Sequence, residues 1–182
     1  MCIRDSYLTE QGFDWEPGYV PGAYRVRGGF VAQHPGFRQG LYSVMGEGSM
    51  IAVRALGVRL GMQVLDCCAA PGGKTLAMGE MMENRGRIIA CDVYPHKLKL
   101  IEQQAERLGI GIADTKLIDG VKGDGSLSGI ADKVLVDAPC SGLGVIRRKP
   151  EIKYKESGEL SELIPIQAQI LDRAAGYLKP GG

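Results

Sequence analysis

The chain has 182 residues, 45% of them hydrophobic, and a formal net charge of +1 at neutral pH. This length accommodates one domain with at most a short appendage. The near-neutral charge excludes a globally basic nucleic-acid-binding surface, so any such surface must be local. No apolar run is long enough to span a membrane, and the five cysteines lack the C-x-x-C spacing of a zinc site. We therefore expect a cytoplasmic protein with reduced thiols and no metal.

Glycine and proline recur throughout residues 7–40. This composition predicts a loop-rich segment with at most short strands, such as one at 23–26. We place a domain boundary near residue 40, so that residues 1–40 form a loop-rich N-terminal segment and residues 41–182 form the main domain.

Helices and strands alternate after about residue 47. We predict a helix at about 50–56, and further helices at about 74–84 and 96–108. The predicted strands are at 63–67, 87–92, 115–119 and 133–137. A last helix has apolar residues from Leu163 to Leu178 on one side, with Pro165 in its first turn or at a kink. This alternation predicts an α/β, doubly wound, Rossmann-like parallel sheet. It calls for another strand after Gly182, so we expect an incomplete sheet in a fragment.

A turn rich in small residues follows the first predicted strand. It consists of Cys68, Ala69, Ala70, Pro71, Gly72, Gly73 and Lys74. Such a turn lets backbone amides approach a ligand closely at the start of a helix, although a purely structural turn is the alternative. The spacing fits neither the phosphate loop nor the dinucleotide fingerprint. Asp92 ends the second strand, where an acid can accept hydrogen bonds from ribose hydroxyls. A nucleoside cofactor without pyrophosphate is favoured, and S-adenosyl-L-methionine fits.

Asp119 and Asp137 end predicted strands, and Cys140 follows the second of these strands. Asp119 is suited to an adenine or ribose contact, or is simply a polar strand end. Asp137 follows a run apolar enough for a central strand. Cys140 comes after Pro139, which stiffens the loop and presents the thiol to the pocket. We favour a chemical role for this thiol over inert packing. Asp66 has three possible roles, which are to orient the turn, to contact the methionine amino group of the cofactor, or to cap the turn.

One cationic cluster follows this loop. It contains Arg147, Arg148, Lys149 and Lys153. A basic loop at the mouth of a pocket can hold a phosphate backbone, so we predict contact with RNA. A solvated loop is the alternative.

These motifs resemble those of the RNA cytosine-C5 methyltransferase family, which includes bacterial 16S rRNA methyltransferase B and the NOL1/NOP2/Sun proteins. Residues 68–75 resemble its C-A-A-P-G-G-K-T loop, and residues 137–140 its D-A-P-C motif. Residues 147–154 resemble the R-R-x-P-[DE]-I-K-[WY] stretch of the methyltransferase B branch. The chain departs from the family's V-Q-D-E at Val44-Met45-Gly46-Glu47.

The resemblance implies S-adenosyl-L-methionine-dependent methylation of cytosine C5 in RNA, with 16S rRNA as the expected substrate. It implies a cofactor site made of residues 68–74 with Asp92, Asp119 and Asp137. The nucleophile would be the cysteine of a T-C motif beyond Gly182, and Cys140 would assist product release. We therefore expect the 182-residue chain alone to be inactive.

The remaining expectations concern organisation and partners. Residues 1–40 would end a preceding RNA-binding region, and residues 41–182 would form a partial methyltransferase domain. We expect a monomer. A rival interpretation is a catalytically silent Rossmann-like module that binds RNA through residues 147–155.

Overall fold

The computed structural model describes residues 3–146, 150–154 and 158–182. Its centre is a parallel sheet of β3 (Gln63–Asp66), β4 (Arg87–Asp92), β5 (Ala113–Leu117) and β6 (Lys133–Leu135). The strand order is β5-β4-β3-β6. Because the order reverses between β3 and β6, the sheet has the switch point of a doubly wound fold, as predicted.

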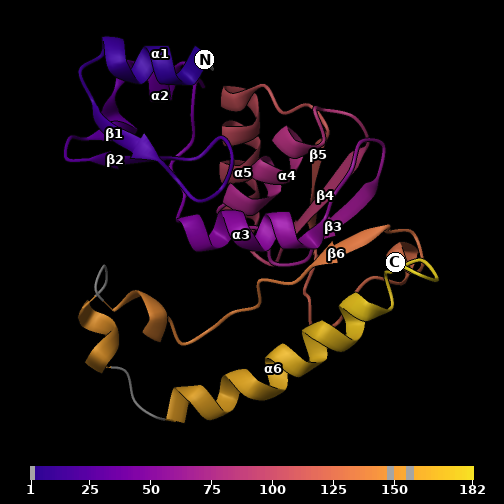
Figure 1. The fold of residues 1–182 in the computed structure, drawn as a ribbon. Helices are drawn as coiled ribbons and strands as arrows, with labels where there is room; N and C mark the ends of the chain where they lie inside the picture. The colour runs from indigo at the N-terminus through magenta and orange to yellow at the C-terminus, as the bar shows by residue number, and fades with distance from the viewer. Residues whose placement is uncertain (1–2, 147–149, 155–157) are drawn as a thin grey trace.

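The helices cover both faces of this sheet (Figure 1). The first face carries α3 (Glu47–Leu56), α4 (Gly73–Met81) and α5 (Pro95–Leu108), and the second carries α6 (Gly158–Ala175). Side chains of a strand alternate between faces. Val64 and Ile88 accordingly pack in a core with residues of α3 and α4, whereas Leu65 and Ile89 pack in a core with Ala174 of α6.

The helix boundaries follow local chemistry. Gly57 and Gly109 end α3 and α5 in the left-handed conformation, which glycine adopts without a steric cost. Pro95 lies in the first turn of α5, where its missing N–H is not needed. Pro165, in contrast, lies inside α6 rather than in its first turn, so one of our two placements was wrong.

The predicted apolar side of α6 is only partly buried. Ile170 and Ala174 are buried in its second half, whereas Ile164 is 67% exposed and Leu171 60% exposed. The apolar pattern therefore overestimated how much of this helix packs on the sheet.

The N-terminal segment contains more regular structure than its composition predicted. It has α1 (Ile3–Glu10), an antiparallel pair of β1 (Asp14–Pro17) and β2 (Tyr24–Arg27), η1 (Val31–Gln33) and α2 (Pro35–Arg38). Arg107 of α5 donates to the carbonyl oxygens of Phe37 and Tyr42, and its guanidinium lies over the Phe37 ring. These contacts join the end of the segment to the main domain. None of the helices in the described ranges is both long and apolar enough to cross a membrane.

Candidate functional site

The cofactor turn, which we define as residues 68–74, connects β3 to α4 at the carboxyl edge of the sheet. The Ala69 N–H donates to the Cys91 carbonyl oxygen at 2.8 Å, which ties the turn to β4. Gly72 has a φ of +104°, and a Cβ there would lie 3.3 Å from Cγ1 of Ile101. Both the backbone conformation and the space thus require glycine. The result is a backbone surface that a ligand can approach closely.

Two carboxylates follow the neighbouring strands. Asp92 ends β4 and is 9% exposed, and its Oδ1 accepts from the Tyr94 N–H at 3.0 Å. Asp119 lies in the turn after β5, where its Oδ1 accepts from the Val121 N–H at 3.0 Å. We had predicted a strand ending at Asp119, but β5 ends at Leu117. Both carboxylates nevertheless lie after strands that run side by side in the sheet.

Lys74 and Asp137 meet across the switch point. The Lys74 ammonium forms an ion pair with Oδ2 of Asp137, which joins the turn after β3 to the loop after β6. The Lys74 side chain is 21% exposed and that of Asp137 56% exposed. We predicted that the strand would reach Asp137, but β6 ends at Leu135. Asp137 therefore belongs to a loop, which leaves it open to solvent.

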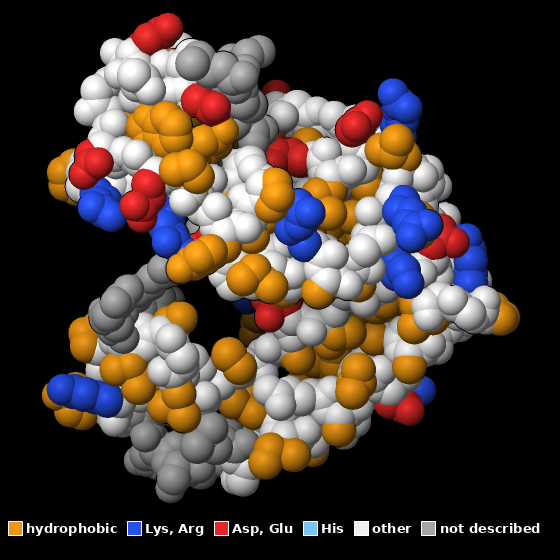
Figure 2. Space-filling model, in the orientation of Figure 1, with side chains coloured by type: hydrophobic (Ala, Val, Ile, Leu, Met, Phe, Trp, Pro, Cys, Tyr) orange, Lys and Arg blue, Asp and Glu red, His pale blue; other side chains and the backbone are white. Residues whose placement is uncertain are grey.

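The Cys140 thiol is exposed on this same loop. The loop is held from α6, because Nε2 of Gln167 donates to the Pro139 carbonyl oxygen at 2.7 Å. Figure 2 shows an opening between the body of the domain and the arm that carries η3 (Leu143–Val145), η4 (Pro150–Tyr154) and α6. The presentation of this thiol to a ligand pocket by Pro139 stays a prediction.

The other described thiols, those of Cys67, Cys68 and Cys91, are less exposed than that of Cys140. Burial raises the pKa of Cys68 to about 11 and that of Cys91 to about 12, and it also raises the pKa of Cys67. All three are therefore protonated at neutral pH, and a thiol must lose its proton to act as a strong nucleophile.

The predicted RNA contacts are described only in part. Arg147, Arg148 and Lys149 lie outside the described residues. Lys153 is exposed in η4, with its Nζ 4.8 Å from the centroid of the exposed Tyr154 ring. The RNA-binding role of this cluster stays a prediction.

The chain matches a family model described as 16S rRNA methyltransferase RsmB/F over residues 53–182. The chain belongs to this family. The match begins in α3 and includes the cofactor turn, the carboxylates of Asp92, Asp119 and Asp137, and the Cys140 loop. Members of the family use S-adenosylmethionine.

Individual RsmB/F relatives agree with this assignment. The probable ribosomal RNA small subunit methyltransferase B of Bacillus subtilis is 40% identical over 178 residues, which cover 96% of this chain and 40% of the relative. The crystal structure of PH0851 superposes with a TM-score of 0.92 at 32% identity, covering 100% of this chain and 42% of that one. NSun6 from Pyrococcus horikoshii, solved with SFG, has a TM-score of 0.76 at 30% identity over 88% of this chain and 42% of its own. The chain thus spans about two fifths of the length of these relatives.

The residues of this RsmB/F site fit S-adenosylmethionine. The turn places small residues and backbone amides at the carboxyl edge of the sheet, and the carboxylates of Asp92 and Asp119 lie where ribose hydroxyls and amino groups can be bound. No cluster of three or more metal-ligating side chains occurs in the described part of the chain. Met45, which departs from the family sequence pattern, lies beside the turn: its Cε is 3.3 Å from the position of a Cβ on Gly73.

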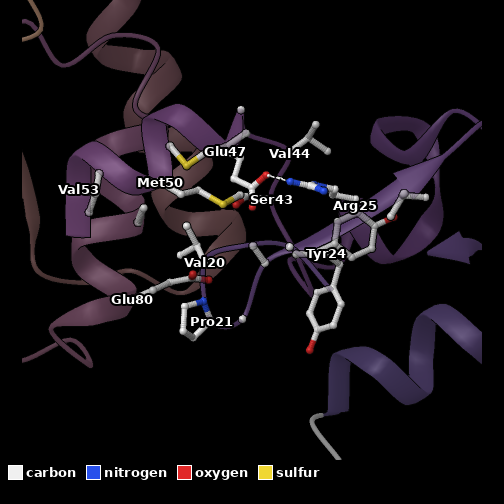
Figure 3. A pocket seen from close by; sticks show the side chains of 18 of the residues that line it. Val20, Pro21, Tyr24, Arg25, Ser43, Val44, Glu47, Met50, Val53 and Glu80 are labelled. Atoms are coloured by element: carbon white, nitrogen blue, oxygen red, sulfur yellow. Dashed lines mark hydrogen bonds and ion pairs between the residues drawn. The ribbon is translucent and has the colours of Figure 1, made fainter. Parts of the chain in front are cut away.

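A large recess adjoins the cofactor turn through Met45, which lines it. This cavity of about 1080 Å³ is formed between the N-terminal segment, α3 and α4, and none of residues 68–74 lines it. Figure 3 shows the Arg25–Glu47 pair at its wall. Arg25 donates to Oε2 of Glu47 from Nη2 at 2.8 Å and from Nε at 3.1 Å, which holds the pKa of Glu47 below its usual range. The sequence pattern does not predict this cavity, because its walls come from segments that are far apart in the chain.

Proposed function

We propose that this chain carries the cofactor site and part of the substrate site of an enzyme that methylates cytosine C5 in RNA, with 16S rRNA as the substrate. The single observation that carries the proposal is the meeting of the cofactor turn and the exposed Cys140 loop at one edge of the sheet. The membership of the RsmB/F family supports both the methyl donor and the class of RNA.

The chemistry explains why such an enzyme uses thiols. C5 of cytosine is a weak nucleophile, and a thiolate that adds to C6 makes C5 nucleophilic enough to accept a methyl group. S-adenosylmethionine supplies the methyl group from its sulfonium. A base then removes the C5 proton, and the bond between C6 and sulfur breaks to release the product.

The candidate site residues have the following roles in this proposal. Asp92 accepts hydrogen bonds from the ribose hydroxyls, and Asp119 contacts the adenosine part of the cofactor. Lys74 and Asp137 face the methionine end of the cofactor or the edge of the cytosine. The backbone amides of the cofactor turn donate hydrogen bonds to the cofactor. RNA phosphates are bound by the basic cluster of Arg147, Arg148, Lys149 and Lys153.

We propose two distinct thiols. The attacking thiol belongs to a T-C motif after residue 182, and Cys140 assists release of the methylated product. In a form of the protein that includes the T-C motif, Cys140→Ser should still attack C6 and accept the methyl group, but then stall as a covalent protein–RNA adduct. Mutation of the T-C cysteine should abolish this adduct.

The test measures transfer of a labelled methyl group from S-adenosylmethionine to 16S rRNA, followed by nucleoside analysis for 5-methylcytidine. Adducts are detected as slow bands on a denaturing gel. Methylation by the 182-residue chain, lost in Cys140→Ser, would make Cys140 the nucleophile and overturn the two-thiol assignment. RNA binding without any methylation by the longer form would instead favour the silent RNA-binding module.

A further inference from the structure

A buried carboxylate beneath the cofactor turn has no role in the proposed reaction. Asp66 ends β3 and is 1% exposed, and Thr75 in the first turn of α4 is 0% exposed. Oγ1 of Thr75 donates to Oδ2 of Asp66 at 2.7 Å. Asp66 and Thr75 flank residues 67–74, which comprise Cys67 and the cofactor turn. The hydrogen bond between them therefore joins the two ends of the turn.

The carboxylate is incompletely satisfied. Oδ1 of Asp66 is buried, and among the described residues it has no hydrogen-bond partner. A charged carboxylate in such a place is unfavourable for folding, because burial removes its hydration. An apolar side chain at this position would cost less folding free energy. A requirement of the binding site therefore explains the presence of a carboxylate better than protein stability does.

We propose that Asp66 and Thr75 are positioning residues that hold the cofactor turn in its ligand-binding shape, and that this hold is strong only when Asp66 is ionised. The proposal rests on the proposed function, because it assigns these residues to the cofactor site. A hydrogen bond to an ionised acceptor is about twice as strong as one between neutral groups. Ionised Asp66 therefore restrains the start of α4, and with it the amides of Gly72, Gly73 and Lys74.

The surroundings of Asp66 support a proton-dependent hold. Burial is the main cause that raises its pKa to about 6. The Thr75 hydrogen bond, the charge of Lys74 and the nearby Cys68 N–H oppose this rise, and the charge of Asp137 adds to it. The other titratable groups that interact with it are Cys67 and Cys68 on its own loop and Cys91 in β4. All three thiols are neutral below pH 8, so they do not change charge in the pH range where Asp66 titrates.

The experiment uses the 182-residue chain and two readouts. Backbone amide NMR shifts of residues 72–74 are followed from pH 5 to 8 without ligand, and calorimetry measures adenosylhomocysteine binding at pH 7.5. In the wild type the three amides should titrate together near pH 6, and in Asp66→Asn they should not. Thr75→Val should weaken adenosylhomocysteine binding about tenfold or more, since a hydrogen bond to a charged group is lost. Thr75→Ser should restore it.

A matched control is Thr115→Val, because Oγ1 of Thr115 also donates to a carboxylate, that of Glu102, but away from the turn. This variant should bind adenosylhomocysteine like the wild type. Turn amides that titrate equally in the wild type and Asp66→Asn, or full binding by Thr75→Val, would overturn the proposed hold. Loss of the amide titration in Asp66→Asn, together with no adenosylhomocysteine binding by the wild type, would instead support the hold and count against the proposed function.

Discussion

The Lys74 ammonium and the Asp137 carboxylate pair across the boundary between β3 and β6, where the strand order of the sheet reverses. In open α/β sheets this boundary is where ligands bind. The pair therefore joins the cofactor turn to the loop that carries Cys140.

Removing the Lys74 charge should affect ligand binding more than folding. A partly exposed ion pair contributes about 0.2–1 kcal/mol to stability, whereas losing a charged donor to a ligand costs about 1.5–3 kcal/mol. Lys74→Ala should thus weaken adenosylhomocysteine binding with little change in melting temperature. Lys179→Ala is the control, because its 2.7 Å pair with Asp132 lies before β6, at the other edge of the sheet. Equal affinities of both variants would remove Lys74 from the cofactor site.

Asp92→Asn should weaken adenosylhomocysteine binding by about 1–3 kcal/mol, because ribose hydroxyls lose a charged acceptor. The amide oxygen can still accept from the Tyr94 N–H, so the local turn is kept. Calorimetry would measure this loss. Asp114→Asn, on the exposed edge strand β5, should bind normally. An unchanged affinity in Asp92→Asn would show that the ribose lies elsewhere.

Gly72→Ala should destabilise the fold as well as the site. A side chain at this φ is strained by about 1–3 kcal/mol, and its Cβ would press on Ile101. Urea unfolding would measure the difference. Gly111→Ala is the comparison, since its backbone has no positive φ and nothing lies within 4 Å of the added Cβ. Similar midpoints for the two variants would contradict the tight packing of the turn.

Replacing two of Arg147, Arg148, Lys149 and Lys153 by glutamine should weaken RNA binding and flatten its salt dependence. Each lost contact with a single-stranded phosphate should change the slope of log K against log salt by about 0.7. Filter binding at several salt concentrations would give the slopes. Lys122, which is 83% exposed, provides a control substitution. Identical slopes for the wild type and the double variant would identify the cluster as an ordinary solvated loop.

The buried Asp66 predicts an unusual trend of stability with pH. Its folded pKa of about 6 lies above its ordinary value of 3.8, so between these values the folded state binds more protons than the unfolded state. Its contribution to stability is therefore full below about pH 4 and is lost as the pH rises through 6. The loss at neutral pH is about 3 kcal/mol.

Asp66→Asn should remove this loss. Urea unfolding at pH 4.5 and pH 7.5 should show a larger fall in the wild type than in the variant. Asp114→Asn should follow the wild type, because Asp114 is exposed. A parallel pH dependence in the wild type and Asp66→Asn would mean that the carboxylate is not desolvated.

The sequence predicted the centre of the fold better than its edges. The limits of β4 were predicted as observed, because both of its faces are buried and its apolar run is continuous. The edge strand β5 lies two residues earlier than predicted, and its last residue, Leu117, is 55% exposed. The helix α1 was not predicted, because few of its residues are apolar and Leu8 is its buried contact.

The candidate site was likewise predicted only in part from the sequence. Motif spacing was enough to bring the cofactor turn, Asp92 and Asp137 to one edge of the sheet, since parallel strands end there together. The pairing of Lys74 with Asp137 and the hydrogen bond from Gln167 to Pro139 could not be predicted, because they join residues 63 and 28 positions apart. Such contacts depend on how side chains fill the space between elements.

The uneven burial of α6 has a mechanical consequence. The helix is anchored through Ile170 and Ala174, while residues 161–166 are mostly exposed and Gln167 holds the loop of Pro139. A rigid rod fixed at one end acts as a lever, so a small tilt about the anchored half moves the other end further. A tilt of this helix would therefore also shift the loop that contains Pro139, because Gln167 is bonded to it.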